Sequence, residues 1–163
     1  MEISDAHQYL LDKGFNLSYS EITGWWKDTG KPSDLLDANR LVLDNIKSDI
    51  TGSIDKNSTV SGRVKIGTNS RVINSNIRGP AVIGENTTIE ESYIGPYSAI
   101  GNGCTISSSE VEYSIIMDGC QINQVQRRIE SSLLGNDVEI LRYKTRTATH
   151  RFMLGDQSRI EIE

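Results

Sequence analysis

The chain has 163 residues, which is enough for one complete domain with a fragment of another but too short for two full domains. Its 14 glycines and only two phenylalanines favour thin, regular β-layers over a core of large aromatic side chains. The net charge of -5 argues against nucleic-acid binding, and the lack of ~20 consecutive apolar residues or a signal-peptide layout predicts a cytoplasmic protein without a membrane partner.

The first 50 residues predict a short α/β unit. Ser4 to Gly14 has the pattern of a helix, with Ser4 as a candidate N-cap and Gly14 as a C-terminal stop, and residues 15–23 alternate as a strand. Pro32 starts a second helix that we expect to end near residues 45–47. One face of this helix is mainly apolar: Leu35, Leu36, Asn39, Leu41, Val42 and Ile46. A single strand cannot bury a sheet, so residues 1–50 are interpreted as the C-terminal remnant of a larger α/β domain.

An internal repeat governs residues 51–141. Five segments begin with an aliphatic residue at spacings of 17, 17, 16 and 18 residues: Ile66, Ile83, Ile100, Ile116 and Leu134. A second aliphatic column follows six residues later: Val72, Ile89, Ile106, Ile122 and Ile140. A third comprises Val60, Ile77, Ile94, Val111 and Ile129. Three aliphatic columns of hexapeptide repeats predict a triangular parallel β-helix of about five turns, in which each column stacks about 4.8 Å from its neighbours.

Two further columns support this coil. Small residues recur four positions after many of the aliphatic ones: Ser58, Val64, Ser70, Ala81, Thr87, Ser98, Cys104, Cys120 and Val138. The two cysteines are therefore interpreted as reduced, buried packing residues and not as a disulfide or a metal site. Glycines at 67, 84, 95, 101 and 135 follow the aliphatic residues and fit the corners of the coil.

The last 22 residues, 142–163, depart from the repeat. A short basic run extends from Lys144 to Arg151, and the alternation of residues 158–163 predicts a terminal strand. We expect this segment to cap the open end of the coil, because unpaired strand edges recruit other chains.

Residues 24–32, Gly-Trp-Trp-Lys-Asp-Thr-Gly-Lys-Pro, are the most specific motif. Together with residues 34–36 and 38–40, this motif resembles the end of the catalytic domain of long-type glucose-1-phosphate thymidylyltransferases, which carry a C-terminal β-helix. The opening Ile-Ser-Asp-Ala of residues 3–6 and the closing Arg-Phe-Met-Leu-Gly-Asp of 151–156 resemble that family too. The resemblance covers the whole chain and implies that the coil winds left-handed. The expected fold is therefore mainly β, a left-handed parallel β-helix preceded by a short α/β remnant.

The resemblance implies that the parent enzyme joins dTTP to glucose 1-phosphate, forming dTDP-glucose and pyrophosphate. Mg²⁺ would neutralise the phosphate charge during in-line attack at the α-phosphorus. In this sequence Asp28 matches the family's metal-binding aspartate, one of two carboxylates, and Trp26 matches the tryptophan that contacts the sugar. Considered without the resemblance, an aspartate before Thr29 and Gly30 is more typical of a turn.

The resemblance also shows what this chain lacks. The family's glycine-rich phosphate loop, its second metal-binding aspartate, and the lysine and glutamate that hold the sugar phosphate all precede the matched region. We therefore expect this chain alone to be inactive and to bind neither Mg²⁺ nor nucleotide and sugar phosphate without the missing domain.

Two other functions remain open. Hexapeptide coils also host acyltransferases, but acetyl transfer needs a histidine base, and the only histidines, His7 and His150, lie outside the repeats. The coil would alternatively serve only as a structural module that assembles subunits. Because closed symmetric assemblies are the general rule and coils of this kind associate along their flat faces, we expect a homo-oligomer, with a trimer favoured over a dimer.

Overall fold

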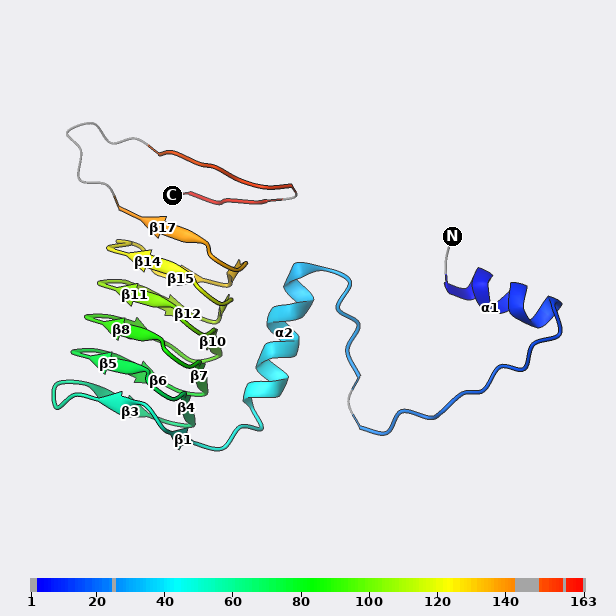
Figure 1. Cartoon of the computed structure of the whole chain (residues 1–163), viewed down its shortest axis with the longest axis horizontal. Helices are drawn as coiled ribbons and strands as arrows, with labels where there is room; N and C mark the ends of the chain where they lie inside the picture. The colour runs from blue at the N-terminus through cyan, green and yellow to red at the C-terminus, as the bar shows by residue number, and fades with distance from the viewer. Residues whose placement is uncertain (1–2, 25, 143–149, 157, 163) are drawn as a thin grey trace.

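The computed structural model describes residues 3–24, 26–142, 150–156 and 158–162. Within these ranges two helices precede a stack of short strands: α1 (Ile3–Asp12) and α2 (Pro32–Leu43). Neither of these described helices has the length and apolar character needed to cross a membrane. Figure 1 shows α1 standing apart from the stack, whereas α2 lies alongside it.

The described strands form three parallel sheets, which are the three walls of a coil. The first wall has six strands: β1 (Asp49–Ile50), β4 (Val64–Ile66), β7 (Ala81–Ile83), β10 (Ser98–Ile100), β13 (Ile115–Ile116) and β16 (Leu133–Leu134). The second wall also has six: β2 (Ser53–Ile54), β5 (Arg71–Ile73), β8 (Thr88–Glu90), β11 (Thr105–Ser107), β14 (Gln121–Asn123) and β17 (Glu139–Leu141). The third has five: β3 (Thr59–Ser61), β6 (Asn76–Arg78), β9 (Tyr93–Ile94), β12 (Glu110–Glu112) and β15 (Ile129–Glu130).

The register of these walls confirms the three aliphatic columns. In the first wall Ile66 pairs with Ile83 and Ile83 with Ile100, and the pairing continues to Leu134. The second column pairs in the same way from Val72 to Ile140, and the third from Val60 to Ile129. The fold is a parallel β-helix of about five turns, in agreement with the expected left-handed β-helix class.

The core runs along the axis of the coil and consists mainly of isoleucine and valine. All three columns are fully buried in the central turns, and the small residues Ala81, Thr87, Ser98, Cys104 and Cys120 are buried between them. In the outermost turns the same columns are only half-buried, as at Val60, Ile129 and Leu134. The core is therefore quasi-one-dimensional, since each turn packs only against its neighbours.

The corners of the coil need residues with left-handed backbone. Asn69, Asn86, Gly103, Gly119 and Asp137 occupy one corner in successive turns, all with φ between +54° and +74°. Asparagine, aspartate and glycine tolerate this region better than other residues. Glycine has a second use at Gly84, where a Cβ would lie 2.6 Å from the carbonyl of Gly101 in the next turn. The turns approach each other too closely there for a side chain.

The expected helix-strand-helix arrangement before the coil is only partly correct. α1 ends where Gly14 adopts φ +78° and the amide of Phe15 donates to the carbonyl of Leu10, which confirms the C-terminal stop. Ser4, however, already lies inside the first turn of α1 and is not its N-cap. The strand predicted over residues 15–23 is wrong, because this described segment is extended without strand pairing. Alternation alone is insufficient where no neighbouring strand accepts the hydrogen bonds.

α2 begins at Pro32 as predicted, and the Asp34 carboxylate caps it by accepting a bond from the amide of Lys31 at 2.9 Å. It ends at Leu43, earlier than expected. The predicted apolar face is partly wrong, because Leu35 and Val42 are exposed while Leu43, outside that set, is 2% exposed. The contact face of α2 is therefore rotated relative to the expected one.

The predicted terminal strand at residues 158–163 is also wrong for the described residues 158–162, which have no strand pairing. In Figure 1 the tail lies beyond β17, at the end of the coil where the cap was expected. Its apolar side chains Phe152, Met153 and Leu154 are exposed. Most of the basic run, residues 144–149, lies outside the described residues.

Candidate functional site

The segment between the two helices carries both sequence-predicted site residues. Trp26 is 69% exposed, and Asp28 is also exposed. Asp28 belongs to no group of three acidic, histidine or cysteine side chains able to hold a metal ion, because the described residues contain no such group. The structure places both predicted residues on an accessible surface.

Lys27, between these two residues, is the residue of the segment that is held in place. Its ammonium lies 3.0 Å from Oδ2 of Asp37 and 3.8 Å from Oδ1 of Asp34, both on α2. The hydrogen bond with Asp37 raises the pKa of Lys27, and the same bond lowers the pKa of Asp37. Both groups are therefore stabilised in their charged forms. A hollow of about 260 Å³ next to this pair is lined by Lys27, Asp37, Arg40 and Leu41.

Two tyrosines of the coil reach the same helix. The Tyr113 hydroxyl donates to Oδ1 of Asp37 at 3.2 Å, and the Tyr97 hydroxyl donates to Asp44 at 3.1 Å. Burial, followed by the hydrogen bond to Asp37, raises the pKa of Tyr113, so this phenol stays protonated and remains a donor. The amide of Asn39 adds a bond to the Tyr97 carbonyl oxygen at 2.9 Å. Asp37 thus contacts both the coil and the segment with the predicted site residues.

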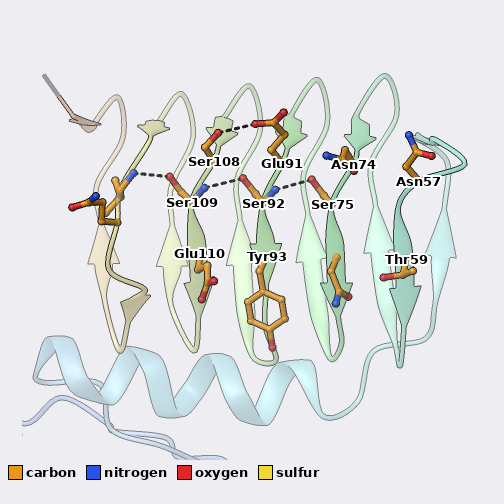
Figure 2. Close-up of a pocket in the computed structure, with 13 residues that line it drawn as sticks. Asn57, Thr59, Asn74, Ser75, Glu91, Ser92, Tyr93, Ser108, Ser109 and Glu110 are labelled. Carbon is orange, nitrogen blue, oxygen red and sulfur yellow. Dashed lines mark hydrogen bonds between the residues drawn. The ribbon is translucent and has the colours of Figure 1, made fainter. Parts of the chain in front are cut away.

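The third wall and its preceding corner form a shallow polar groove of about 710 Å³. Figure 2 shows its side chains arranged in rows, with Asn74, Glu91 and Ser108 along one row and Ser75, Ser92 and Ser109 along the next. Each of these three serine hydroxyls accepts a bond from the backbone amide of the following turn, at 3.0 to 3.2 Å. The serine row therefore satisfies backbone donors within the wall.

A charged cluster lies at the edge of this groove. The Arg128 guanidinium contacts Glu110 at 2.9 Å and Glu112 at 2.8 Å, and lies 5.0 Å from the centre of the Tyr93 ring. These contacts join three successive turns of the third wall. Because one arginine bonds to both carboxylates, the cluster is explained as an ion-pair contact between turns.

Both cysteines are buried inside the coil, as expected, and neither forms a disulfide. The thiol of Cys104 donates to the carbonyl of Met117 at 3.1 Å, and that of Cys120 to the carbonyl of Gly135 at 3.0 Å. Burial is the largest cause that raises the pKa of each thiol, so little thiolate forms near neutral pH. They are packing residues.

This burial predicts the thiol chemistry of the folded chain. We expect a thiol-specific disulfide reagent at pH 8 to label neither cysteine in the native protein and both after denaturation, because the thiolate is the reactive form. Absorbance of the released thiolate measures the labelling. A Ser158→Cys variant provides an exposed control that should react at once. Rapid labelling of folded wild-type chain would contradict the buried, inert assignment.

The two histidines lie outside the coil, in agreement with the sequence. His7 is on α1, and His150 stacks on Phe152 in the tail with ring centres 5.9 Å apart. Both side chains are exposed. The structure therefore places neither histidine in a wall of the coil.

The residues missed by sequence reasoning are Lys27, Asp37, Tyr97 and Tyr113. The two tyrosines left a signal in the sequence, because they fall 16 residues apart, which is the length of one turn of the repeat. The ion pair left no such signal, since it joins residues ten positions apart across a bend in the chain.

Similarity to known proteins covers the whole chain. The chain is 44% identical over 163 residues to a glucose-1-phosphate thymidylyltransferase of Streptomyces antibioticus, and the match covers 100% of the chain and 46% of that protein. The chain is homologous to the C-terminal part of this enzyme. It is also 41% identical over 162 residues to a glucose-1-phosphate thymidylyltransferase of Streptomyces griseus, covering 99% of the chain and 45% of that protein. The chain thus spans about half the length of these relatives.

A more distant relative is matched over a shorter stretch. The low-salt glycan biosynthesis nucleotidyltransferase Agl11 of Haloferax volcanii is 41% identical over 70 residues, 43% of the chain and 20% of that protein. No protein-family model matches the chain. The matched relatives support an origin within the nucleotidyltransferases.

Proposed function

We propose that this chain is the C-terminal β-helix and assembly portion of a glucose-1-phosphate thymidylyltransferase and does not catalyse nucleotidyl transfer alone. The parent reaction would be dTTP plus glucose 1-phosphate to dTDP-glucose plus pyrophosphate. The observation that supports this proposal is the match over the full chain at 44% identity to an enzyme of that name, with the Trp26–Asp28 segment exposed beside the coil.

Within that reaction two side chains of this segment have roles that fit their setting. The exposed indole of Trp26 offers a flat apolar surface of the kind on which a sugar ring packs. Asp28 supplies one hard carboxylate oxygen, which suits Mg²⁺. One aspartate alone does not hold Mg²⁺, which needs several oxygen ligands, and the described residues contain no group of three acidic, histidine or cysteine side chains that would supply them. We assign the remaining ligands and the nucleotide-binding residues to the part of the relatives that this chain does not match.

The proposal predicts a clear pattern of activity. With Mg²⁺, dTTP and glucose 1-phosphate, we expect the purified chain to release no more pyrophosphate than its Asp28→Ala variant. When the chain is fused behind the unmatched part of the Streptomyces antibioticus relative, release should appear and fall on the order of 100-fold or more with Asp28→Asn, since even residues that only orient metal ligands cost 10- to 100-fold.

Asp49→Asn, on β1, is the matched control and should leave the activity of the fusion unchanged. Two results would contradict the proposal: release from the isolated chain that depends on Asp28, or a folded fusion protein that shows no activity.

For assembly, we propose a homo-oligomer, with a trimer ahead of a dimer. The three parallel sheets that form the walls of the coil and the exposed apolar side chains Phe152, Met153 and Leu154 of the tail support association. At tens of micromolar, light scattering should return about three times the 18.1 kDa of one chain. A monomer mass at that concentration would overturn the assembly proposal.

A further inference from the structure

Two tyrosines of the coil adopt a backbone conformation that is unfavourable for bulky residues. Tyr97 has φ +60° and Tyr113 has φ +45°, at the same corner in successive turns. Their amides donate to the carbonyls of Pro80 and Pro96 at 2.6 and 3.0 Å. Aromatic residues seldom occupy the left-handed region, and such strain persists only where surrounding contacts stabilise it. The contacts that these two tyrosines make therefore indicate why the unfavourable backbone conformation is kept at this corner.

The contacts of both tyrosines are with α2. Tyr97 bonds to α2 through Asn39 and to Asp44 just after it, and Tyr113 bonds to Asp37. The two rings also contact each other edge to face, with centres 6.2 Å apart and planes at 78°. A further ion pair joins Arg63 of the coil to Asp44 at 3.6 Å. Several bonds from the coil thus hold one face of α2.

Asp37 connects the coil to the segment that precedes α2. One carboxylate oxygen accepts the Tyr113 hydroxyl bond, and the other accepts the Lys27 ammonium at 3.0 Å. The charged and titratable groups around Asp37 are Lys27, Asp34, Arg40 and Tyr113. A continuous series of contacts therefore runs from the coil, through Tyr113 and Asp37, to the residue between Trp26 and Asp28.

We propose that Lys27 is a positioning residue, which ties the Trp26–Asp28 segment to the β-helix through Asp37 and Tyr113. The coil then sets where the sugar-contacting indole and the metal-binding carboxylate stand, in addition to assembling subunits. This tether, the contacts of Lys27 with Asp37 and of Asp37 with Tyr113, concerns only this chain. Its catalytic consequence rests on the proposed roles of Trp26 and Asp28.

The tether is testable on the chain itself, because its only two tryptophans, at positions 25 and 26, directly precede Lys27. We expect Lys27→Met to increase the mobile fraction of the segment roughly twofold to fivefold, the range for losing an exposed ion pair, measured as the fast component of tryptophan anisotropy decay. Lys27→Arg should restore most of the wild-type decay, and Asp37→Asn should behave like Lys27→Met. The exposed Lys47→Met is the matched control and should change nothing.

The Asp37 carboxyl provides a second readout. Its pKa is lowered first by the hydrogen bond from Lys27, so the ion pair is present above the ordinary carboxyl range and is lost as the pH falls through the lowered value. In a carbon-13 NMR titration, Lys27→Met should shift the Asp37 midpoint upward, and Tyr113→Phe should do so by a smaller amount. The circular dichroism of the coil should be unchanged in both variants.

The two claims fail separately. An unchanged anisotropy decay and an unchanged Asp37 midpoint in Lys27→Met would overturn the tether. In the active fusion protein, Lys27→Met should raise the KM for glucose 1-phosphate and lower kcat, with Lys27→Arg restoring both. Altered mobility without a kinetic effect would overturn the positioning role, whereas an inactive wild-type fusion would overturn the proposed function and leave the tether measurements standing.

Discussion

Replacing Ile106 by alanine is expected to lower the free energy of unfolding by about 2–5 kcal/mol, the usual cost of removing a buried isoleucine side chain. Ile106 is fully buried in the central turn, where it pairs with Ile89 below and Ile122 above. The cavity therefore interrupts the column on both sides. Because each turn of a solenoid is stabilised only by its neighbours, collapse of the walls cannot fill the gap without disturbing the register of adjacent turns.

Urea unfolding followed by far-ultraviolet circular dichroism measures this change. Ile22→Ala is the matched control, since that side chain is 68% exposed in the segment before α2 and its removal should alter stability by less than ~0.5 kcal/mol. If the two variants unfold at the same urea concentration, the axial position of the Ile106 column is incorrect.

Replacing Gly84 by alanine should destabilise the chain by about 1–3 kcal/mol, the range for forcing extra atoms into a close-packed site. A Cβ at Gly84 would lie 2.6 Å from the carbonyl carbon and oxygen of Gly101 and from the side-chain oxygen of Asn102. The first two are backbone atoms, so the next turn must move as a whole. The amide of Gly84 also donates to the carbonyl of Ile100 at 2.8 Å, a bond that this movement would stretch.

The control for this variant lies in the same column of corner glycines. Gly135 follows the last residue of the first aliphatic column, and a Cβ there meets nothing within 4 Å. Gly135→Ala should therefore unfold at or slightly above the wild-type temperature, because alanine restricts the unfolded chain. Equal losses of stability at both glycines would show that the spacing between turns is not the cause.

The coil was predictable because its information is periodic and local. A repeat of 16 to 18 residues fixes which residues stack, and Ile66, Ile83 and Ile100 indeed pair in register. The segments outside the repeat lack this redundancy. Residues 15–23 alternate like a strand, but pairing also needs a partner, and the described chain provides none. The buried Leu43 was missed because its environment depends on how α2 docks, which the helical period does not specify.

The candidate site shows the same contrast between features that the sequence predicts and features that depend on the folded structure. Trp26 and Asp28 were identified through a family resemblance, and no spacing pattern within the chain would have selected them. The bond between Tyr113 and Asp37 joins residues 76 positions apart, so it exists only in the folded protein. Sequence reasoning therefore named the two residues with proposed chemical roles but not the lysine between them that the fold holds in place.

The stacking of similar turns also makes the length of the coil proportional to the number of its turns. Each turn adds about 4.8 Å along the axis, and the register of every turn depends only on the one before it. Inserting or deleting one whole turn between the corner of Tyr113 and the last strand would move the tail by one such step while leaving the attachment of α2 unchanged. Inserting a single residue would instead rotate every inward side chain of its strand outward. Evolution of this module is thus expected to change its length in whole turns.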